Sequence, residues 1–276
     1  MTPARYTNVQ REGISYRFGH AVARRPGRSV VNGLRAAERG LPDPGLFLDE
    51  HKAYISALER AGLTVTVLNP LEAFPDSVFI EDTALCLPQG DVILRPGAAS
   101  RTDEAEATAT ALSSFNRQTH HIGEEGYVDG GDILVTDSII LIGLSHRTDM
   151  AGAEALKGVL NNWGYHVLTA HTPENVLHLK SDCCVLDSET VLATSRLSGA
   201  ECFKSFRVLT VPRGEEAAAN SIRINDKVLV SAGFPATADL IAHENYEVEL
   251  VPTSQAALLD GGLSCLSLRF GWIQQS

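Results

Sequence analysis

The sequence of 276 residues contains a cysteine, a histidine and a carboxylate whose surroundings suit chemistry. Cys265 follows two glycines in D-G-G-L-S-C-L, His178 lies between two leucines, and Asp129 lies in V-D-G-G-D. A cysteine can act as a nucleophile, a histidine as an acid or base, and a carboxylate can orient the histidine. The alternative for each is structural: a buried thiol, a histidine satisfied within the core, and a turn aspartate.

Acidic side chains are concentrated in F-P-D-S-V-F-I-E-D, residues 74–82. Pro75 disfavours helix before it and the V-F-I run favours a strand, so we predict an extended segment. Side chains alternate along a strand, which would place Asp76 and Asp82 on one face and Glu81 on the other. Two interpretations stay open here: a strand whose acidic ends are solvated, or a pocket for a cation, because buried carboxylates need partners.

Two arginines occupy similar positions in the chain. Arg101 follows G-A-A-S and Arg147 follows G-L-S-H, each just after a predicted strand. A solvated arginine is the ordinary interpretation of each. Their equivalence makes a paired role in gripping a carboxylate plausible, since guanidinium groups bind carboxylates through two hydrogen bonds.

A repeat of strand, tight turn, strand, helix and strand must position these residues. Its helix-following strands begin at residues 63, 119, 165, 206 and 246, and helices are expected near 48–61, 103–115, 150–163, 198–205 and 236–244. The last strand, Leu263 to Phe270, lacks a return partner, which Phe18 to Ala23 could supply. We therefore predict an α/β fold, a five-bladed propeller of ββαβ repeats; a doubly wound sheet competes but does not predict the tight hairpins.

The start of each unit's first strand carries a polar residue or a cysteine. These are Glu81 and Asp82, Asp129, His178, Asn220 and Cys265. Equivalent positions of a ring converge on its axis, so we predict that these side chains meet in one central site. Carboxylates would bind a cation there and arginines an anion, which fits a guanidino amino acid.

Composition limits the partners. The net charge of −11 argues against nucleic acid and anionic membranes, and no apolar run is long enough to span a bilayer. The N-terminus lacks the apolar core of a signal peptide, so we expect a cytoplasmic protein. The five cysteines are odd in number and irregular in spacing, which indicates free thiols and no structural zinc.

These motifs resemble those of the dimethylarginine dimethylaminohydrolases, within the guanidino-group-modifying (pentein) superfamily. The resemblance runs from about Ala21 to Phe270. It rests on the segments 74–82, 95–101 (R-P-G-A-A-S-R), 129–132 (D-G-G-D), 143–148 (G-L-S-H-R-T), 177–181 (L-H-L-K-S), 218–222 (A-A-N-S-I) and 260–270 (D-G-G-L-S-C-L-S-L-R-F). It implies the five-bladed fold and hydrolysis of asymmetric dimethylarginine or monomethylarginine to citrulline and a methylamine, through a covalent intermediate on a cysteine.

The resemblance also implies roles for individual residues and no cofactor or metal. Cys265 is the expected nucleophile, His178 the acid and base, and Asp129 its carboxylate partner. The expected substrate-binding residues are Leu34 (through its backbone), Asp76, Glu81, Asp82, Arg101 and Arg147.

The expected organisation is one catalytic domain over residues 1–276, with flexible tails at about 1–17 and 271–276, and a homodimer is possible. Two alternatives remain. One is another guanidino-modifying enzyme, such as an arginine deiminase or an amidinotransferase, although these are usually longer. The other is a non-catalytic binding module of the same fold, which would not need Cys265 and His178.

Overall fold

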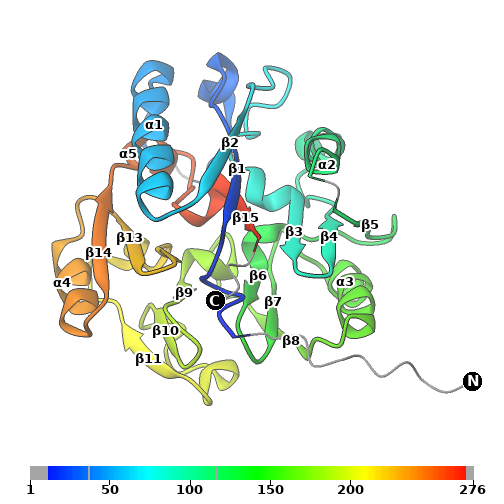
Figure 1. Cartoon of the computed structure of the whole chain (residues 1–276). Coiled ribbons are helices and arrows are strands. Elements are labelled where there is room, and N and C mark those ends of the chain that lie inside the picture. Colours follow the sequence, from blue (N-terminus) through cyan, green and yellow to red (C-terminus); the bar gives the residue numbers. More distant parts are fainter. Residues whose placement is uncertain (1–11, 37, 116, 272–276) are drawn as a thin grey trace, which may run out of the picture.

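A computed structural model describes residues 12–36, 38–115 and 117–271 of the chain. Its strands form five three-stranded sheets, or blades, arranged around a common centre, with the long helices outside them (Figure 1). Blade 1 holds β3 (Ala84–Leu87), β4 (Gly90–Ile93) and β5 (Thr119–His121), and blade 2 holds β6 (Ile133–Val135), β7 (Ile140–Leu144) and β8 (Val167–His171). Blade 3 holds β9 (Cys183–Val185), β10 (Thr190–Ala193) and β11 (Arg207–Thr210). Blade 4 holds β12 (Ile222–Ile224), β13 (Lys227–Ser231) and β14 (Glu247–Val251), and blade 5 holds β15 (Ser267–Phe270), β1 (His20–Arg24) and β2 (Thr64–Leu68).

Every blade has the same connectivity. Its first two strands pair antiparallel, and its middle strand pairs parallel with the third. A parallel pair needs a crossover, and in four blades the crossover contains an α-helix. The predicted ββαβ propeller is confirmed, and five separate sheets exclude the doubly wound alternative.

Blade 5 closes the ring with strands from both ends of the chain. β1 pairs antiparallel with β15, with His20 opposite Phe270, and parallel with β2, with His20 opposite Thr64. The predicted return partner for the last strand is therefore correct.

Four of the five expected helices form, and the structure adds one short helix, Ser254–Ala257, that was not expected. The observed α-helices are α1 (Pro44–Arg60), α2 (Glu104–Ser113), α3 (Met150–Asn162), α4 (Pro235–His243) and the short α5 (Ser254–Ala257). α1 and α3 begin at aspartate caps, where Asp43 accepts a hydrogen bond from the Leu46 N–H and Asp149 from the Gly152 N–H. The helix expected at 198–205 is wrong: only a 3-10 turn, Glu201–Phe203, forms there, because so short a segment containing Gly199 makes a marginal helix.

A 3-10 turn precedes the inner strand of every blade. The five turns are Ile80–Thr83, Gly130–Asp132, Leu179–Ser181, Glu216–Ala219 and Ser264–Leu266. The extended segment predicted over 74–82 is therefore wrong: the Phe79 N–H bonds to the Asp76 carbonyl, the Asp82 N–H bonds to the Phe79 carbonyl, and β3 begins only at Ala84. These turns place the polar side chains that come just before each inner strand at one end of the ring.

Residues 12–18 are packed against the opposite end of the blades. The backbone of Gly13 and the hydroxyl of Ser15 donate to Asp137, and the Phe18 N–H donates to the side-chain oxygen of Asn225. Ile14 is also buried. The flexible tail predicted through residue 17 is thus wrong for residues 12–17, while residues 1–11 and 272–276 lie outside the described part of the chain. Across the described residues, no helix combines the length and apolar character needed to cross a bilayer.

Candidate active site

The five turns bring side chains from all five blades to one end of the ring. There, one cavity is lined by residues from several of these turns and from the loops around them. Its lining residues are Leu34, Asp76, Phe79, Asp82, Arg101, Arg147, Leu177, His178, Leu259, Asp260, Gly261 and Cys265. The cavity therefore contains most of the predicted site residues, and Asp129 lies directly beneath it.

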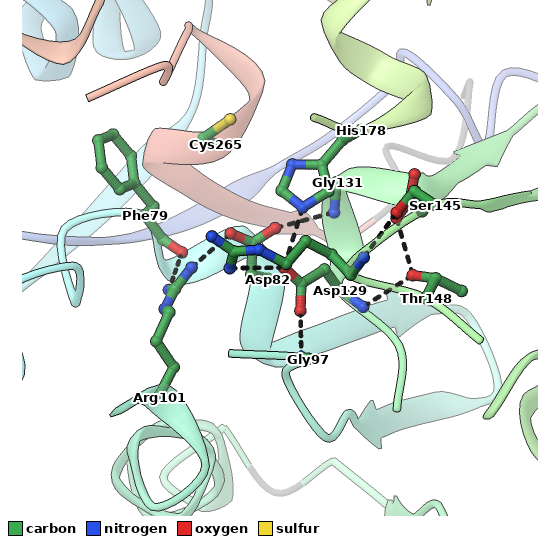
Figure 2. Close-up of polar contacts among 12 residues, drawn as sticks. Phe79, Asp82, Gly97, Arg101, Asp129, Gly131, Ser145, Thr148, His178 and Cys265 are labelled. Atoms are coloured by element: carbon green, nitrogen blue, oxygen red, sulfur yellow. Dashed lines mark hydrogen bonds and ion pairs between the residues drawn. The ribbon is translucent and has the colours of Figure 1, made fainter. Parts of the chain in front are cut away.

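His178 and Asp129 form a buried pair. Nε2 of His178 lies 2.9 Å from Oδ2 of Asp129 (Figure 2). The other carboxylate oxygen accepts the Gly97 N–H at 2.7 Å, and the Thr148 hydroxyl accepts the Asp129 N–H. With both oxygens engaged, Asp129 fixes the position of the imidazole.

The space beside this pair admits only a glycine at position 131. A Cβ atom at this position would lie 2.6 Å from Nδ1 of His178. The absence of a side chain lets the imidazole stack directly on the D-G-G-D turn, and the Gly131 N–H is free to donate to Asp82 at 2.9 Å. The glycine thus serves two blades at once.

Asp82 is held by Arg101. Nη1 of Arg101 lies 2.6 Å from Oδ2 of Asp82, while its Nε and Nη2 bind the two oxygens of Glu104 at 2.9 and 2.7 Å. Nη2 also donates to the Phe79 carbonyl. Arg101 was predicted to bind a substrate carboxylate through two hydrogen bonds. In this geometry the two N–H groups needed for such a contact, on Nε and Nη2, are already bound to Glu104.

Arg147 is placed differently. It lines the cavity, and its Nη1 makes one long ion pair, 3.6 Å, with Oδ2 of Asp129. Its side chain is 18% exposed, against 4% for that of Arg101. Of the two predicted arginines, Arg147 has the guanidinium that can turn to an anionic group in the cavity.

Asp76 connects the cavity to the loop that carries Leu34. Its Oδ1 accepts the Leu34 N–H at 2.9 Å, and Gly33 packs closely against the same carboxylate. Burial raises the pKa of Asp76, against the opposing effects of Arg101, the Leu34 N–H and Arg147. Asp76 and Leu34 therefore lie together at the cavity, and their predicted contact with a substrate stays a prediction.

Glu81 lies elsewhere. Its Oε1 binds Lys180 at 2.6 Å and Arg269 at 2.7 Å, while Oε2 is buried without a partner among the described residues. It lines a second cavity of about 110 Å³ on the other side of the turns, not the one with Cys265. Glu81 therefore does not line the cavity that contains Cys265, in contrast to the direct substrate contact that was predicted. Its negative charge raises the pKa of the Cys265 thiol.

The segment before Cys265 needs its glycines. A Cβ on Gly261 would lie 2.2 Å from the Phe79 ring, and one on Gly262 would lie 2.5 Å from Cγ of Asn220. These contacts confirm the close approach predicted from the D-G-G sequence. Figure 2 shows the Cys265 side chain apart from the connected network of charged groups.

The protonation states follow from burial and charge. Burial, then Glu81 and Asp82, raise the pKa of Cys265 to about 11. Burial opposes a charge on His178, but Asp82, the hydrogen bond to Asp129, and Asp132 raise the pKa of His178 to about 9. At neutral pH the empty site thus holds a thiol and an imidazolium, and a bound cation would favour the thiolate.

Asp82, Asp129 and His178 are the described residues that could hold a metal, since their ligand atoms lie within 4.8 Å of one another. Each carboxylate already has a cationic partner: Arg101 on Asp82, and His178 and Arg147 on Asp129. The two carboxylates therefore do not present the unpaired ligand atoms that a metal ion would need.

Several lining residues were missed from the sequence. Phe79, Leu177, Leu259 and Gly261 supply an apolar wall, and Asp260 accepts the Ala36 N–H at 2.5 Å. Phe79 lies in the segment 74–82 and Gly261 in the segment 260–270, so their nearness in sequence to Asp82 and Cys265 could have indicated that they line the cavity. Leu259 had none, because only the fold brings it there.

Comparison with known proteins agrees with this geometry. A sequence model of the family described as "N,N dimethylarginine dimethylhydrolase, eukaryotic" matches residues 45–195. The N(G),N(G)-dimethylarginine dimethylaminohydrolase of Pseudomonas aeruginosa is 39% identical over 254 residues, covering 92% of this chain and all of that protein. The enzyme of that name from Streptomyces coelicolor is 33% identical over 251 residues, covering 90% of this chain and 96% of its own.

A solved structure gives the same answer. A cysteine-to-serine mutant of the Pseudomonas aeruginosa enzyme, complexed with citrulline, superposes with a TM-score of 0.89 at 38% identity, covering 92% of this chain and all of that one. The chain belongs to the dimethylarginine dimethylaminohydrolase family.

Proposed function

We propose that this protein hydrolyses asymmetric dimethylarginine or monomethylarginine to citrulline and dimethylamine or methylamine, using Cys265 as the nucleophile. The observation that carries the proposal is a single cavity lined by Cys265, His178, Asp82 and Arg147. Such a cavity offers a thiol, a proton donor, a carboxylate for a guanidinium and a guanidinium for a carboxylate. The family membership and the citrulline complex of the Pseudomonas aeruginosa enzyme support it.

The substrate is bound at both ends. Burial opposes a charge on Asp82, but the charges of His178 and Arg101 and the hydrogen bonds donated by Arg101 and the Gly131 N–H lower its pKa, so Asp82 is charged. Asp82 and Asp76 accept N–H groups of the substrate guanidinium, and the Leu34 backbone contacts the substrate from the loop that Asp76 holds. Arg147 binds the α-carboxylate, with Arg101 adding positive charge to the same side of the cavity.

The reaction begins when the bound guanidinium lowers the pKa of Cys265, and the thiol proton passes to solvent because His178 already carries one. The thiolate attacks the guanidinium carbon and forms a carbon–sulfur bond. The imidazolium of His178 gives its proton to the nitrogen of the departing methylated amine as the carbon–nitrogen bond breaks. An S-alkylthiouronium then remains on Cys265.

Water completes the turnover. The neutral imidazole of His178, held by Asp129, removes a proton from a water molecule that attacks the same carbon. The carbon–sulfur bond breaks, the departing thiolate takes up the remaining hydroxyl proton, and citrulline is released with the thiol of Cys265 and the imidazolium of His178 restored. One molecule of water is consumed and one amine is produced, with no cofactor.

The apolar wall supports a methylated leaving group. An N,N-dimethylated nitrogen has no N–H, so it suits a wall without acceptors, here Phe79, Leu177 and Leu259. A buried carboxylate facing methyl groups would lose its hydrogen bond at a cost of several kcal/mol. Symmetric dimethylarginine would place a methyl group against Asp82 or Asp76 and is expected to be a poor substrate.

The test is turnover of asymmetric dimethylarginine, symmetric dimethylarginine and arginine by the purified protein, with citrulline and the released amine both quantified. We expect dimethylamine from the asymmetric compound and much slower ammonia release from arginine, and no product from the Cys265→Ser control. Faster turnover of arginine would make the protein a deiminase, and no turnover of any would indicate another guanidine. The expected cytoplasmic location and the possible homodimer stay predictions.

A further inference from the structure

Asn220 occupies the blade 4 position around the axis, and the reaction above gives it no role. It is 7% exposed and ends the 3-10 turn Glu216–Ala219, just before β12. The equivalent positions of the other blades carry Asp82, Asp129, His178 and Cys265. Asn220 is therefore an uncharged side chain within a ring of ionisable ones.

Its carboxamide is held by the segment that carries the nucleophile. Oδ1 accepts the Ser264 N–H at 2.9 Å, and Nδ2 lies 3.8 Å from Sγ of Cys265. The orientation is determined chemically: the Ser264 backbone N–H can only donate, so the oxygen must face it and the NH₂ must face the sulfur. A Cβ at Gly262 would collide with this carboxamide, so the glycine keeps the contact open.

Few groups near Sγ favour its charged form. Glu81 and Asp82 oppose a thiolate, and among the described groups Lys180 and the backbone N–H of Gly262 act in the opposite direction. His178 faces the same cavity but has a proton to deliver to the leaving amine. The Ser264 hydroxyl lies 3.9 Å from the sulfur and can donate or accept. The Asn220 NH₂ can only donate.

We propose that Asn220 is a positioning residue that fixes the Cys265 turn and directs an N–H at Sγ to stabilise the thiolate. A hydrogen bond to a charged acceptor is stronger than one to a neutral acceptor, so this contact gains strength as the sulfur ionises. Asn220 does not line the substrate cavity and acts only through Cys265. The role in turnover rests on the proposed function; the role in thiol ionisation does not.

The test uses Asn220→Asp, which keeps the shape and the acceptor for Ser264 but replaces the donor with an oxygen. Iodoacetamide labelling of Cys265 is followed by peptide mass spectrometry over a range of pH, with the half-exposed Cys202 as an internal reference in the same molecule. We expect labelling of Cys265 at pH 8 to fall roughly tenfold or more, as expected for losing a charge-assisted bond. The whole pH–rate curve should move to higher pH, while Cys202 is unaffected.

Two further variants complete the experiment. Asn245→Asp, on the exposed surface, adds the same charge away from the site and should leave labelling of Cys265 unchanged. Asn220→Asp also brings a negative charge close to Sγ, which by itself opposes the thiolate. Gly262→Ala displaces the carboxamide without adding a charge, so slower labelling of Cys265 in this variant identifies the lost N–H as the cause, and an unchanged pH–rate curve in it would contradict the proposal. In turnover, Asn220→Asp should lower kcat more than it changes KM.

If the pH–rate curve of Asn220→Asp were the same as that of the wild type, the proposal would be wrong, and Asn220 would only hold the turn through the Ser264 N–H. This result is independent of the substrate, because labelling needs none. Failure of the wild-type protein to turn over methylated arginines would instead count against the proposed function and leave the labelling comparison intact.

Discussion

The two sides of the candidate site are held in different ways. The charged side, consisting of Asp82, Arg101, Asp129, Arg147 and His178, is joined by ion pairs and hydrogen bonds, most of them 2.6–2.9 Å long. The thiol side, consisting of Asn220, Ser264 and Cys265, is joined around its sulfur by contacts of 3.8 and 3.9 Å. The charged side is therefore preorganised by short hydrogen bonds and ion pairs, whereas the sulfur of Cys265 makes only long, weak hydrogen bonds.

This difference separates two tasks of the site. The charged side is already joined by short hydrogen bonds and ion pairs before substrate arrives, so it needs little reorganisation to receive a guanidinium. In the proposed mechanism, Cys265 on the thiol side is protonated before substrate binds, and the charge of the substrate activates it. A cysteine controlled in this way reacts slowly until the correct cation is bound.

The largest effect should come from removing the sulfur. Cys265→Ser is expected to lower turnover by at least about 10⁴-fold, because no other group can form the covalent intermediate. The protein should remain folded, since the two side chains have similar size. The measurement is citrulline formation together with thermal unfolding; Cys183→Ser and Cys184→Ser serve as controls and should keep their activity. Activity near wild type in Cys265→Ser would show that Cys265 is not the nucleophile.

Asp129→Asn tests whether the charged side orients the acid. The substitution keeps the size but places a neutral amide against Nε2 of His178, which weakens the stabilisation of the imidazolium. We expect kcat to fall by about 10²- to 10⁴-fold with a smaller change in KM, the usual range for impaired acid–base catalysis. If kcat were unchanged, the 2.9 Å contact between His178 and Asp129 would have no part in proton transfer.

The two arginines should separate binding from stability. Arg147→Ala is expected to raise KM for α-amino-acid substrates roughly ten- to a hundredfold, as for one lost charge-assisted bond, with little loss of stability. Arg101→Ala leaves Asp82 and Glu104 buried without their cation and should cost about 3–5 kcal/mol in the free energy of unfolding. Denaturant unfolding and steady-state kinetics on both variants distinguish them. Equal stability of the two variants would contradict the structural role assigned to Arg101.

The smallest effect is a displacement of pH profiles. Turnover needs the thiolate of Cys265 together with the imidazolium of His178, but in the free protein the pKa of Cys265 is about 11 and that of His178 about 9. Only a small fraction of the protein therefore carries this combination, and that fraction is largest between about pH 9 and 11. The ratio kcat/KM should rise with pH to about 9, level off, and fall above about 11. Bound substrate brings a cation to the thiol and lowers its pKa. The rising limb of kcat should therefore lie at lower pH than that of kcat/KM. Superimposed limbs would mean that substrate does not activate the thiol.

Much of the fold followed from the sequence because the repeat is regular. Strand pairs, helix positions and even the closing partner of the last strand could be predicted from spacing and hydrophobic pattern. The 3-10 turns could not, since V-F-I in residues 78–80 has strand propensity and only tertiary contacts around the axis make it turn. The same limit applies to residues 12–17, whose anchors, Asp137 and Asn225, are far away in sequence.

The sequence was a better guide to which residues form the site than to the hydrogen bonds and ion pairs between them. Equivalent positions in the repeat led to Cys265, His178, Asp129 and Asp82. The occupation of the Arg101 fork by Glu104 was not visible, because an exposed i,i+3 pair and a buried one have the same spacing. The place of Glu81 in the second cavity also depends on Lys180 and Arg269, which are contributed by other blades.

The closure of blade 5 has a consequence for how the protein is made. β1 is among the first described segments to be synthesised and β15 among the last, and they meet only when His20 finds Phe270. Cys265 lies immediately before β15, so the thiol reaches its neighbours only when this clasp has formed. A ribosome that has finished the first four blades therefore carries an open ring without Cys265, and pairing of β15 with β1 closes the ring and adds this thiol to the site in one step. Such long-range closure is slow by nature, because the chain must first lose the entropy of a loop almost as long as itself.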